Sequence, residues 1–203
     1  MLYYAPQGWI SDDTDAAERV RIQYGTSMCY PISSMGSHVS VVPNHQLNRI
    51  TSLHTRANVA YFGTFGYELD LNKLTDEEIA EVKAQIIFMK EYRELIQFGN
   101  FYRLKSPFDG NETVWMTVSE DKRKALVFWY RERNVVNAEF TRVRLQGLDP
   151  DLIYKNEYNG TENYGDELMN LGLLTTDVTA GEPTNEDLPC TDYESRIYVL
   201  TAE

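Results

Sequence analysis

The stretch MLYYAPQGWISDDTDAAER, residues 1–19, decides how the first half of this chain folds. An apolar and aromatic run reaches Ile10 and then changes into the acidic segment Ser11–Asp15. A helical pattern follows at once, with Ala16 and Val20 on one face. Strand, acidic corner and helix in this order predict the βα unit of a barrel or doubly wound sheet. Catalytic groups in such folds sit at the carboxyl ends of the strands, so a carboxylate here is a candidate general acid or base.

The same alternation of strands and helices continues through residues 1–98. The clearest helix begins at Thr75, which forms a capping box with Glu78, and ends before Gly99. The segment from Val42 to Ile50 is polar and predicts a loop. We expect a strand or an extended entry at Leu2–Ile10 and strands at Tyr30–Ser34 and Ala60–Phe65. Helices are expected at Thr14–Tyr24, Ser52–Ala60 and Thr75–Phe98.

The period of the pattern changes near Gly99. Residues 99–203 show the alternation of a half-buried antiparallel sheet, for example Val143 and Leu145 against Arg142 and Arg144. This pattern is typical of a β-sandwich. We expect strands at Phe101–Leu104, Thr113–Val118, Ala125–Tyr130, Glu139–Leu145 and Arg196–Thr201, and a long exposed loop at residues 175–195.

Composition excludes several classes of protein. The chain has 203 residues, 42% of them hydrophobic, and a net charge of -12, which argues against a nucleic-acid partner. No apolar run is long enough to span a membrane, and no secretory signal is visible. Two cysteines, Cys29 and Cys190, do not form a disulfide framework and favour a cytoplasmic protein with reduced thiols.

The block L-Y-Y-x-P-Q-x-W-x-S-D-D-T-D-A, which starts at Leu2, resembles the acid/base block of the retaining α-galactosidases of glycoside hydrolase family 36. Further blocks are similar to that family in the same order. One departure is Leu47-Asn48, where the family often has Thr-Gly. The other blocks are Ile22–Thr26, Ser37–Ser40, Pro43–Gln46, Thr55–Ala60, Phe62–Asp70 and Tyr164–Asn170.

The resemblance implies an α/β part followed by an all-β part. Residues 1–98 would be the C-terminal strands and helices of a (β/α)8 TIM barrel, and residues 99–203 an antiparallel β-sandwich. Three strand–helix units cannot close a barrel that needs eight. We therefore expect this chain to be about the last quarter to third of such an enzyme.

The resemblance also implies an activity, the hydrolysis of terminal α-galactosyl residues from α-galactosides such as melibiose and raffinose, with retention. Asp12 matches the family's general acid/base, while Trp9, Asp13 and His38 are candidate substrate-binding residues. The Lys-x-Asp block of the nucleophile and the Cys-Ser-x-Gly-Gly block are not in this sequence. The isolated chain is therefore expected to be inactive, although a full-length enzyme would act on α-galactoside oligosaccharides without a cofactor, as a homo-oligomer.

Plainer interpretations of these residues stay open. Asp13 could cap a helix or be solvated in a loop, and Asp15 could begin the helix and pair with Arg19. Trp9 could belong to the barrel core, and His38 could be a hydrogen-bonded structural residue. The three histidines lack the spacing of a metal site. The alternatives for the function are a non-catalytic fragment or carbohydrate-binding remnant, and a related α-N-acetylgalactosaminidase or galactosyl transferase.

Overall fold

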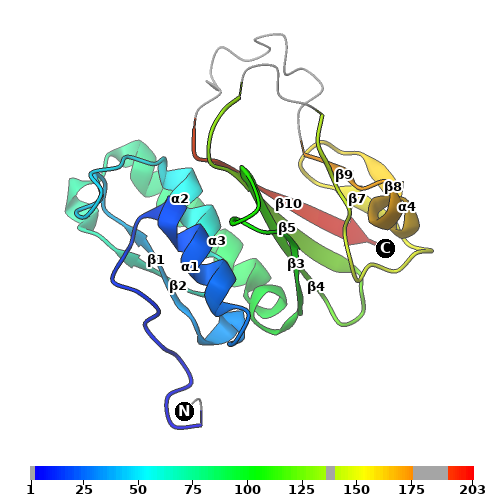
Figure 1. Ribbon diagram of the computed structural model, residues 1–203, viewed down its shortest axis with the longest axis horizontal. Coiled ribbons are helices and arrows are strands. Elements are labelled where there is room, and N and C mark those ends of the chain that lie inside the picture. Colours follow the sequence, from blue (N-terminus) through cyan, green and yellow to red (C-terminus); the bar gives the residue numbers. More distant parts are fainter. Residues whose placement is uncertain (1–2, 136–139, 176–191) are drawn as a thin grey trace. The chain divides into compact units, whose positions relative to one another are not determined.

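The computed structural model describes residues 3–135, 140–175 and 192–203. It divides into two compact units, Met1–Phe98 and Gly99–Glu203. Figure 1 shows helices gathered around strands β1 and β2 in the first unit, and mainly antiparallel strands in the second. No helix within the described ranges is long and apolar enough to cross a membrane.

The first unit contains a strand–helix–strand motif. Strand β1 (Gly36–Ser40) runs parallel to β2 (Thr64–Glu68), and α2 (Leu53–Ala60) lies between them in the chain and contacts both. Parallel neighbours need such a crossover, which the sequence pattern predicted. The remaining elements of this unit are α1 (Ala16–Thr26), α3 (Asp76–Phe98) and two short 3-10 helices, η1 (Ile32–Ser34) and η2 (Leu71–Lys73).

The two faces of the β1–β2 pair have different neighbours. On one face, Ser37 donates a hydrogen bond to Gln23 of α1 at 2.7 Å, and Tyr67 donates to Gln85 of α3 at 2.8 Å. The opposite face carries His38, because side chains alternate along a strand. Gly66 lies beside this imidazole, and a Cβ there would come within 3.2 Å of its Cδ2 atom. The helices therefore cover one face, and His38 marks the other.

The helices of the first unit begin near the expected residues. Asp15 is the N-cap of α1, and Ser52 is the N-cap of α2. The capping box of α3 is complete, since the Thr75 N–H donates to the Glu78 carboxylate at 2.9 Å and the Glu78 N–H donates to Oγ1 of Thr75 at 3.2 Å. Local capping signals located these helices to within about two residues.

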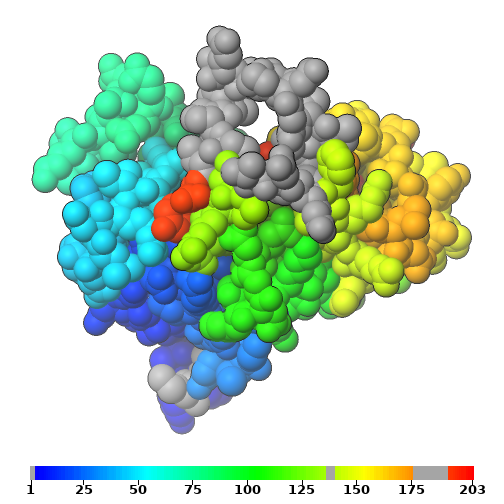
Figure 2. All heavy atoms as spheres, turned by 45° about the horizontal axis from the view of Figure 1, so that its top comes forward, coloured from blue at the N-terminus to red at the C-terminus, as the bar shows by residue number. Residues whose placement is uncertain are grey.

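One predicted strand of the first unit is wrong, and for Leu2–Ile10 the strand is the wrong one of the two alternatives. Tyr30–Ser34 contains η1 instead, and the strand begins at Gly36. Residues 3–10 form no strand apart from one isolated parallel bridge between Gly8 and Met35. In Figure 2 the dark blue N-terminal residues lie at the surface next to the lighter blue residues that follow α1. Tyr3 and Tyr4, at the start of this apolar run, are exposed and lie outside the core.

The third predicted strand, Ala60–Phe65, begins too early. Ala60 still belongs to α2, and β2 starts at Thr64. Gly63 makes the sharp connection possible, since a Cβ there would lie only 2.6 Å from the Cβ of Ser37. The glycine lets the chain pass close to β1 before the strand begins.

The second unit is built on a six-stranded antiparallel sheet in the order β3-β4-β5-β10-β7-β8. A separate pair, β6 with β9, is also antiparallel. Four of the five predicted strands are confirmed as β3, β4, β5 and β10. The strands are β3 (Asn100–Lys105), β4 (Glu112–Val118), β5 (Lys124–Arg131), β6 (Arg142–Val143), β7 (Ile153–Asn156), β8 (Glu162–Tyr164), β9 (Leu173–Leu174) and β10 (Glu194–Ala202), with one helix, α4 (Gly165–Asn170).

An apolar core covers one face of this sheet. Val127 of β5 stands between Met116 of β4 and Tyr198 of β10 in the register, and all three are buried. Side chains from β6, β9 and α4 complete the cluster. Alternate residues of each strand enter the core, as expected for a pleated sheet. The other members are Val114, Val118, Ala125, Trp129, Val143, Leu145, Leu148, Tyr154, Leu168, Leu173 and Leu200.

Other expectations for the second unit are only partly met. The strand predicted at Glu139–Leu145 is reduced to β6, although Val143 and Leu145 are buried while Arg142 is exposed, as predicted. Residue 139 lies outside the described part. Of the loop predicted at residues 175–195, positions 176–191 also lie outside it. Glu194 and Ser195 belong to β10 rather than to a loop.

Candidate active site

The acidic corner before α1 is organised by short-range hydrogen bonds. Oγ of Ser11 accepts from the N–H of Asp13 at 3.0 Å, and Oδ1 of Asp13 accepts from the N–H of Asp15 at 3.0 Å. Oδ1 of Asp15 in turn accepts from the first amides of α1, those of Ala17 and Glu18, at 3.1 Å each. Asp13 and Asp15 therefore hold the turn and the helix start through their carboxylates, which is the structural role expected of such residues.

Asp12 has a different environment. Its side chain is exposed, and its Oδ1 accepts a hydrogen bond from the indole Nε1 of Trp9 at 3.0 Å. The indole also contacts the imidazole of His38, with ring centroids 4.5 Å apart and an interplanar angle of 33°. The structure thus brings three of the predicted site residues together, on the face of β1 opposite the helices. Asp13 is adjacent in the chain, but its carboxylate points back to the turn.

Asp15 is buried and forms an ion pair with Arg49. Arg49 comes from the predicted polar loop, and it also lies 3.6 Å from the carboxylate of Glu18. The prediction that Asp15 pairs with Arg19 one turn further along the helix is therefore wrong. The long-range partner prevails because Asp15 caps the helix with the same carboxylate and stays at its N-terminal end.

Arg19 links the acidic corner to the sheet instead. It is 4% exposed and donates to the backbone carbonyls of Ser11 at 3.4 Å and of Gly36 at 2.5 Å. Burial lowers the pKa of this guanidinium, while the negative charges of Asp13 and Glu68 act in the opposite direction. The corner and the first residue of β1 are therefore tied to one buried cation.

His38 lies within the same set of charges. Burial lowers the pKa of its imidazole, Glu68 raises it, and Arg19 lowers it further. Since burial is the largest of these causes, the neutral imidazole is favoured around neutral pH. Stacking against Trp9 suits this neutral ring.

Glu68 and Arg19 were missed as residues around the site. Glu68 is the last residue of β2 and is paired in the register with Ser40 of β1. Counting back by two along β2 places it on the same face as Gly66, next to His38. The alternation of side chains within the Phe62–Asp70 segment could have pointed to Glu68, but only once the position of β2 was known.

The loop after β1 is fixed by Asn44, which is buried. Its Nδ2 donates to Oγ1 of Thr14 at 3.3 Å, and its Oδ1 accepts from the amides of Gln46 and Leu47 at 2.9 Å each. Asn48 has φ 53°, in the left-handed region where glycine is favoured and asparagine is tolerated. The change from glycine to Asn48 is therefore compatible with the loop.

The other histidines are separate from this site. His45 is exposed, and Nε2 of His54 lies 2.9 Å from Nδ2 of Asn58 within α2. In the part of the chain that the structure describes, no group of three or more His, Cys, Asp or Glu side chains could hold a metal ion. Cys29 is exposed and free, while Cys190 lies outside the described residues.

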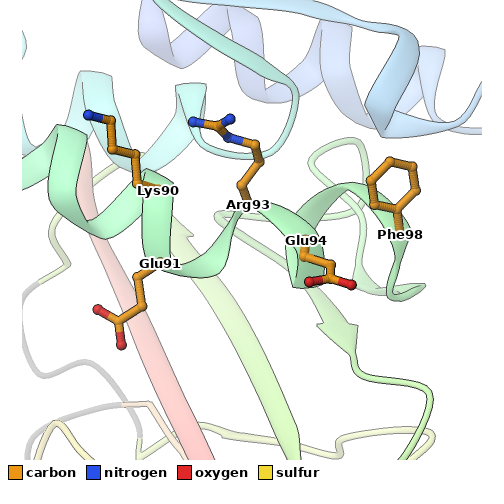
Figure 3. A pocket seen from close by; sticks show the side chains of 5 residues that line it. All are labelled: Lys90, Glu91, Arg93, Glu94 and Phe98. Atoms are coloured by element: carbon orange, nitrogen blue, oxygen red, sulfur yellow. The ribbon is translucent and has the colours of Figure 1, made fainter.

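A hollow on the surface of α3 does not overlap the candidate site. Lys90 and Arg93 point to one side of the helix and Glu91 to the other, with Glu94 and Phe98 nearer its C-terminal end (Figure 3). All five residues belong to α3, and all five are exposed. Charges of both signs occur there as on any solvated helix, which makes this hollow an ordinary part of the surface.

Asp12 can therefore serve as a single proton donor or acceptor. Its carboxylate is accessible, and one of its oxygens is held by the Trp9 indole. The neighbouring acidic residues are occupied with backbone amides, which leaves them less free to exchange a proton with a ligand. The geometry fits one half of a two-carboxylate mechanism.

The chain matches two known protein families. Residues 1–99 match the family described as Melibiase, and residues 112–200 match the glycosyl hydrolase family 36 C-terminal domain. The chain is 55% identical over 173 residues to alpha-galactosidase AgaA of Geobacillus stearothermophilus. That match covers 85% of this chain and 24% of the relative, so the chain spans about a quarter of the length of such relatives.

Solved structures agree with this similarity. Crystal structures of variants of the Geobacillus stearothermophilus GH36 alpha-galactosidase AgaA, one in complex with raffinose and one with stachyose, each superpose with a TM-score of 0.91 at 48% identity. The raffinose complex covers 100% of this chain, which in turn covers 27% of that protein. The similarity includes both units of the chain.

Proposed function

Because the chain belongs to glycoside hydrolase family 36, we propose that it supplies the general acid/base, Asp12, for hydrolysis of terminal α-galactosyl residues with retention. The observation that carries this role is the accessible Asp12 carboxylate, anchored by Trp9 beside His38. The nucleophilic carboxylate lies outside these 203 residues in this proposal. The fourfold greater length of the relatives supports that part.

In the first step of this mechanism, the outside carboxylate forms a bond to the anomeric carbon while the bond to the glycosidic oxygen breaks. The bonding electron pair passes to that oxygen, which takes the proton of Asp12 and leaves as an alcohol. A retaining enzyme holds its two carboxyl groups about 5 Å apart for this purpose.

In the second step, a water molecule attacks the anomeric carbon and Asp12, now a carboxylate, takes a proton from it. The bond to the nucleophile breaks, and its electron pair returns to that carboxylate. Asp12 ends the cycle protonated, so no cofactor is required. Its accessible position next to the turn allows both the sugar oxygen and the water to approach.

We assign the first unit to the C-terminal portion of a (β/α)8 barrel and the second to a C-terminal β-sandwich. The parallel β1–β2 pair with its α2 crossover and the acidic corner before α1 support the first assignment. The six-stranded antiparallel sheet and the β6–β9 pair around one core support the second.

The proposed substrates are α-galactosides such as melibiose and raffinose. Trp9 and His38 would contact the sugar, since both lie next to Asp12 and the indole is 53% exposed. Asp13 would contribute through its remaining carboxylate oxygen. The complexes of the relatives with raffinose and stachyose support this substrate class.

A hybrid enzyme tests the proposal. This chain is placed in alpha-galactosidase AgaA of Geobacillus stearothermophilus, in place of the segment that it matches, and the hybrid is assayed with raffinose and an aryl α-galactoside. We expect activity with both, and a loss of at least about a hundredfold on raffinose in Asp12→Asn. Asp76→Asn, an exposed residue at the start of α3, is the matched control and should change nothing.

The leaving group then identifies the role of Asp12. In Asp12→Ala, cleavage of an activated aryl galactoside should survive far better than cleavage of raffinose, because a good leaving group needs little protonation. Azide should restore turnover by replacing the base-activated water. Equal losses on both substrates without azide rescue would contradict the acid/base role, and an inactive hybrid with wild-type Asp12 would favour a carbohydrate-binding remnant.

A further inference from the structure

The indole of Trp9 joins two groups that are far apart in the sequence. Its Nε1–H donates to Oδ1 of Asp12 at 3.0 Å, and its ring lies against the imidazole of His38 with centroids 4.5 Å apart. The backbone next to it is fixed as well, since the Gly8 N–H donates to the carbonyl of Ser34 at 2.8 Å and the Gly36 N–H donates to the carbonyl of Gly8 at 2.9 Å. The indole is therefore anchored at its backbone, on its ring and at its N–H.

We propose that Trp9 is a positioning residue that selects which oxygen of Asp12 carries the catalytic proton, and that His38 holds Trp9 in place for this purpose. The inference rests on the acid/base role of Asp12 proposed above. It adds that the two carboxyl oxygens of Asp12 have different roles.

The chemistry of the indole distinguishes the two oxygens of Asp12. An indole N–H can donate a hydrogen bond but cannot accept one. The oxygen that it contacts is therefore an acceptor in both protonation states of Asp12. A carbonyl oxygen accepts a hydrogen bond more strongly than the hydroxyl oxygen of an acid, so this contact favours the proton on Oδ2. Oδ2 then gives the proton to the glycosidic oxygen and later takes one from water, while Oδ1 stays bound to the same donor.

Holding the carboxyl group in one orientation has a kinetic benefit. A freely rotating carboxylic acid would present either oxygen, and either face, to the leaving group. The contact with Trp9 removes that freedom before the substrate binds, which lowers the entropic part of the barrier. Neither Asp13 nor Asp15 can take over this role, because their Oδ1 atoms accept hydrogen bonds from backbone amides.

His38 is well placed to support the indole. It projects from β1 between two glycines, and a Cβ would come within 3.5 Å of its Cε1 at Gly36 and within 3.2 Å of its Cδ2 at Gly66. The imidazole thus lies close against the backbone of both strands. The charged groups that face this region are Asp12, Asp13, Arg19 and Glu68.

Nuclear magnetic resonance of the whole 203-residue chain tests the contact directly. The chain has three tryptophans, so ¹⁵N labelling gives three indole N–H signals. Trp115 and Trp129 are 1% exposed and serve as internal references. We expect the Trp9 signal, assigned by its loss in Trp9→Phe, to shift when the chain is brought to a pH acidic enough to protonate exposed carboxylates.

Two further variants separate the possible sources of that shift. In Asp12→Asn the transition should disappear, whereas in His38→Phe, which keeps a ring for stacking, it should remain. A transition that survives in Asp12→Asn but is lost in His38→Phe would overturn the proposal, because the indole would then report on the imidazole alone. A Trp9 signal that does not move with pH in the folded chain would overturn it as well.

The hybrid enzyme provides the kinetic test. Trp9→Phe retains the ring and loses the N–H, so kcat on raffinose should fall roughly tenfold, as for the loss of a hydrogen bond to a charged group. The aryl galactoside with a good leaving group should lose much less. An unchanged kcat on raffinose, or a change in KM alone, would contradict the positioning role. Full raffinose activity in Asp12→Asn would instead contradict the proposed function, whatever the Trp9 signal does.

Discussion

The two units of the chain hold their strands by different interactions. In the first unit, buried polar side chains connect α1 to its neighbours. Arg19 donates to the carbonyls of Ser11 and of Gly36 in β1, and Gln23 donates to those of Val59 and Phe62 at the end of α2. In the second unit, the six-stranded sheet presents apolar residues such as Val127 to one shared core. A core defined by apolar alternation tolerates exchange of similar side chains, whereas the polar ties of the first unit depend on particular donors and acceptors.

The largest expected effect concerns the apolar core. Trp129→Ala removes a side chain that is 1% exposed and should lower the free energy of unfolding of the second unit by about 3–5 kcal/mol. Hydrogen exchange of the amides in β4 and β5 measures this loss. Leu171→Ala in the same unit is the control because Leu171 is 63% exposed, and it should cost less than about 1 kcal/mol. Similar losses for both variants would contradict the assignment of Trp129 to the core.

A smaller loss in the free energy of unfolding is expected when a buried hydrogen-bonding side chain of the first unit is replaced. Arg19→Met leaves the carbonyls of Ser11 and Gly36 without this donor, and each unpaired buried group costs about 1–3 kcal/mol. We expect a loss of about 3 kcal/mol, measured by hydrogen exchange in α1 and β1. Arg21→Met on the same helix removes a partly exposed contact with Glu18 at 3.8 Å and should stay within about 0.5 kcal/mol. A neutral Arg19→Met would show that apolar packing suffices here too.

The helix cap of α1 should contribute less again. Asp15→Ala removes both the cap and the ion pair with Arg49, and should cost about 2 kcal/mol in the exchange of the α1 amides. Asp15→Asn keeps an acceptor for the cap and loses only the charge, so it should recover roughly half of that cost. If Asp15→Asn were as destabilising as Asp15→Ala, the ion pair rather than the cap would account for the effect.

The smallest effect is a pH dependence from His38. Burial lowers the pKa of its imidazole in the folded chain, while in the unfolded chain it titrates near 6.5. Below that pH the unfolded state binds more protons than the folded state, so the free energy of unfolding falls as the pH is lowered. The contribution of His38 to stability is fully present above that pH. His38→Gln should therefore flatten the decline in thermal stability between about pH 7.5 and 5.5. An unchanged slope would contradict the burial of the imidazole.

The comparison of the units also explains which predictions from sequence succeeded. Helix α3 was located because its signals are local: Thr75 and Glu78 form the capping box within one turn. Strands β4 and β5 were located because their buried runs are long. The strands and the helix between residues 153 and 174 were missed, since each has at most six residues and a weak pattern.

The first unit was harder because tertiary contacts decide its details. Strand β1 reads Gly-Ser-His-Val-Ser and contains one aliphatic residue, so its burial cannot be read from composition. Arg19 was assigned to Asp15 by helical spacing, yet the two carbonyls compete more effectively for its guanidinium. For the site, sequence pattern and family resemblance selected Asp12, Trp9 and His38, which lie together, but the alternation that points to Glu68 required the true position of β2.

The position of β10 in the second sheet has a consequence for synthesis on the ribosome. Strands β3, β4 and β5 form a meander of neighbours, and β7 and β8 form a second local pair, but β10 joins the two groups by pairing with both β5 and β7. The ion pair between Arg131 and Glu194 closes a separation of 63 residues. The edges of β5 and β7 therefore stay unpaired until β10 has left the exit tunnel. We therefore expect translation speed and chaperone access during that interval to influence the yield of folded protein.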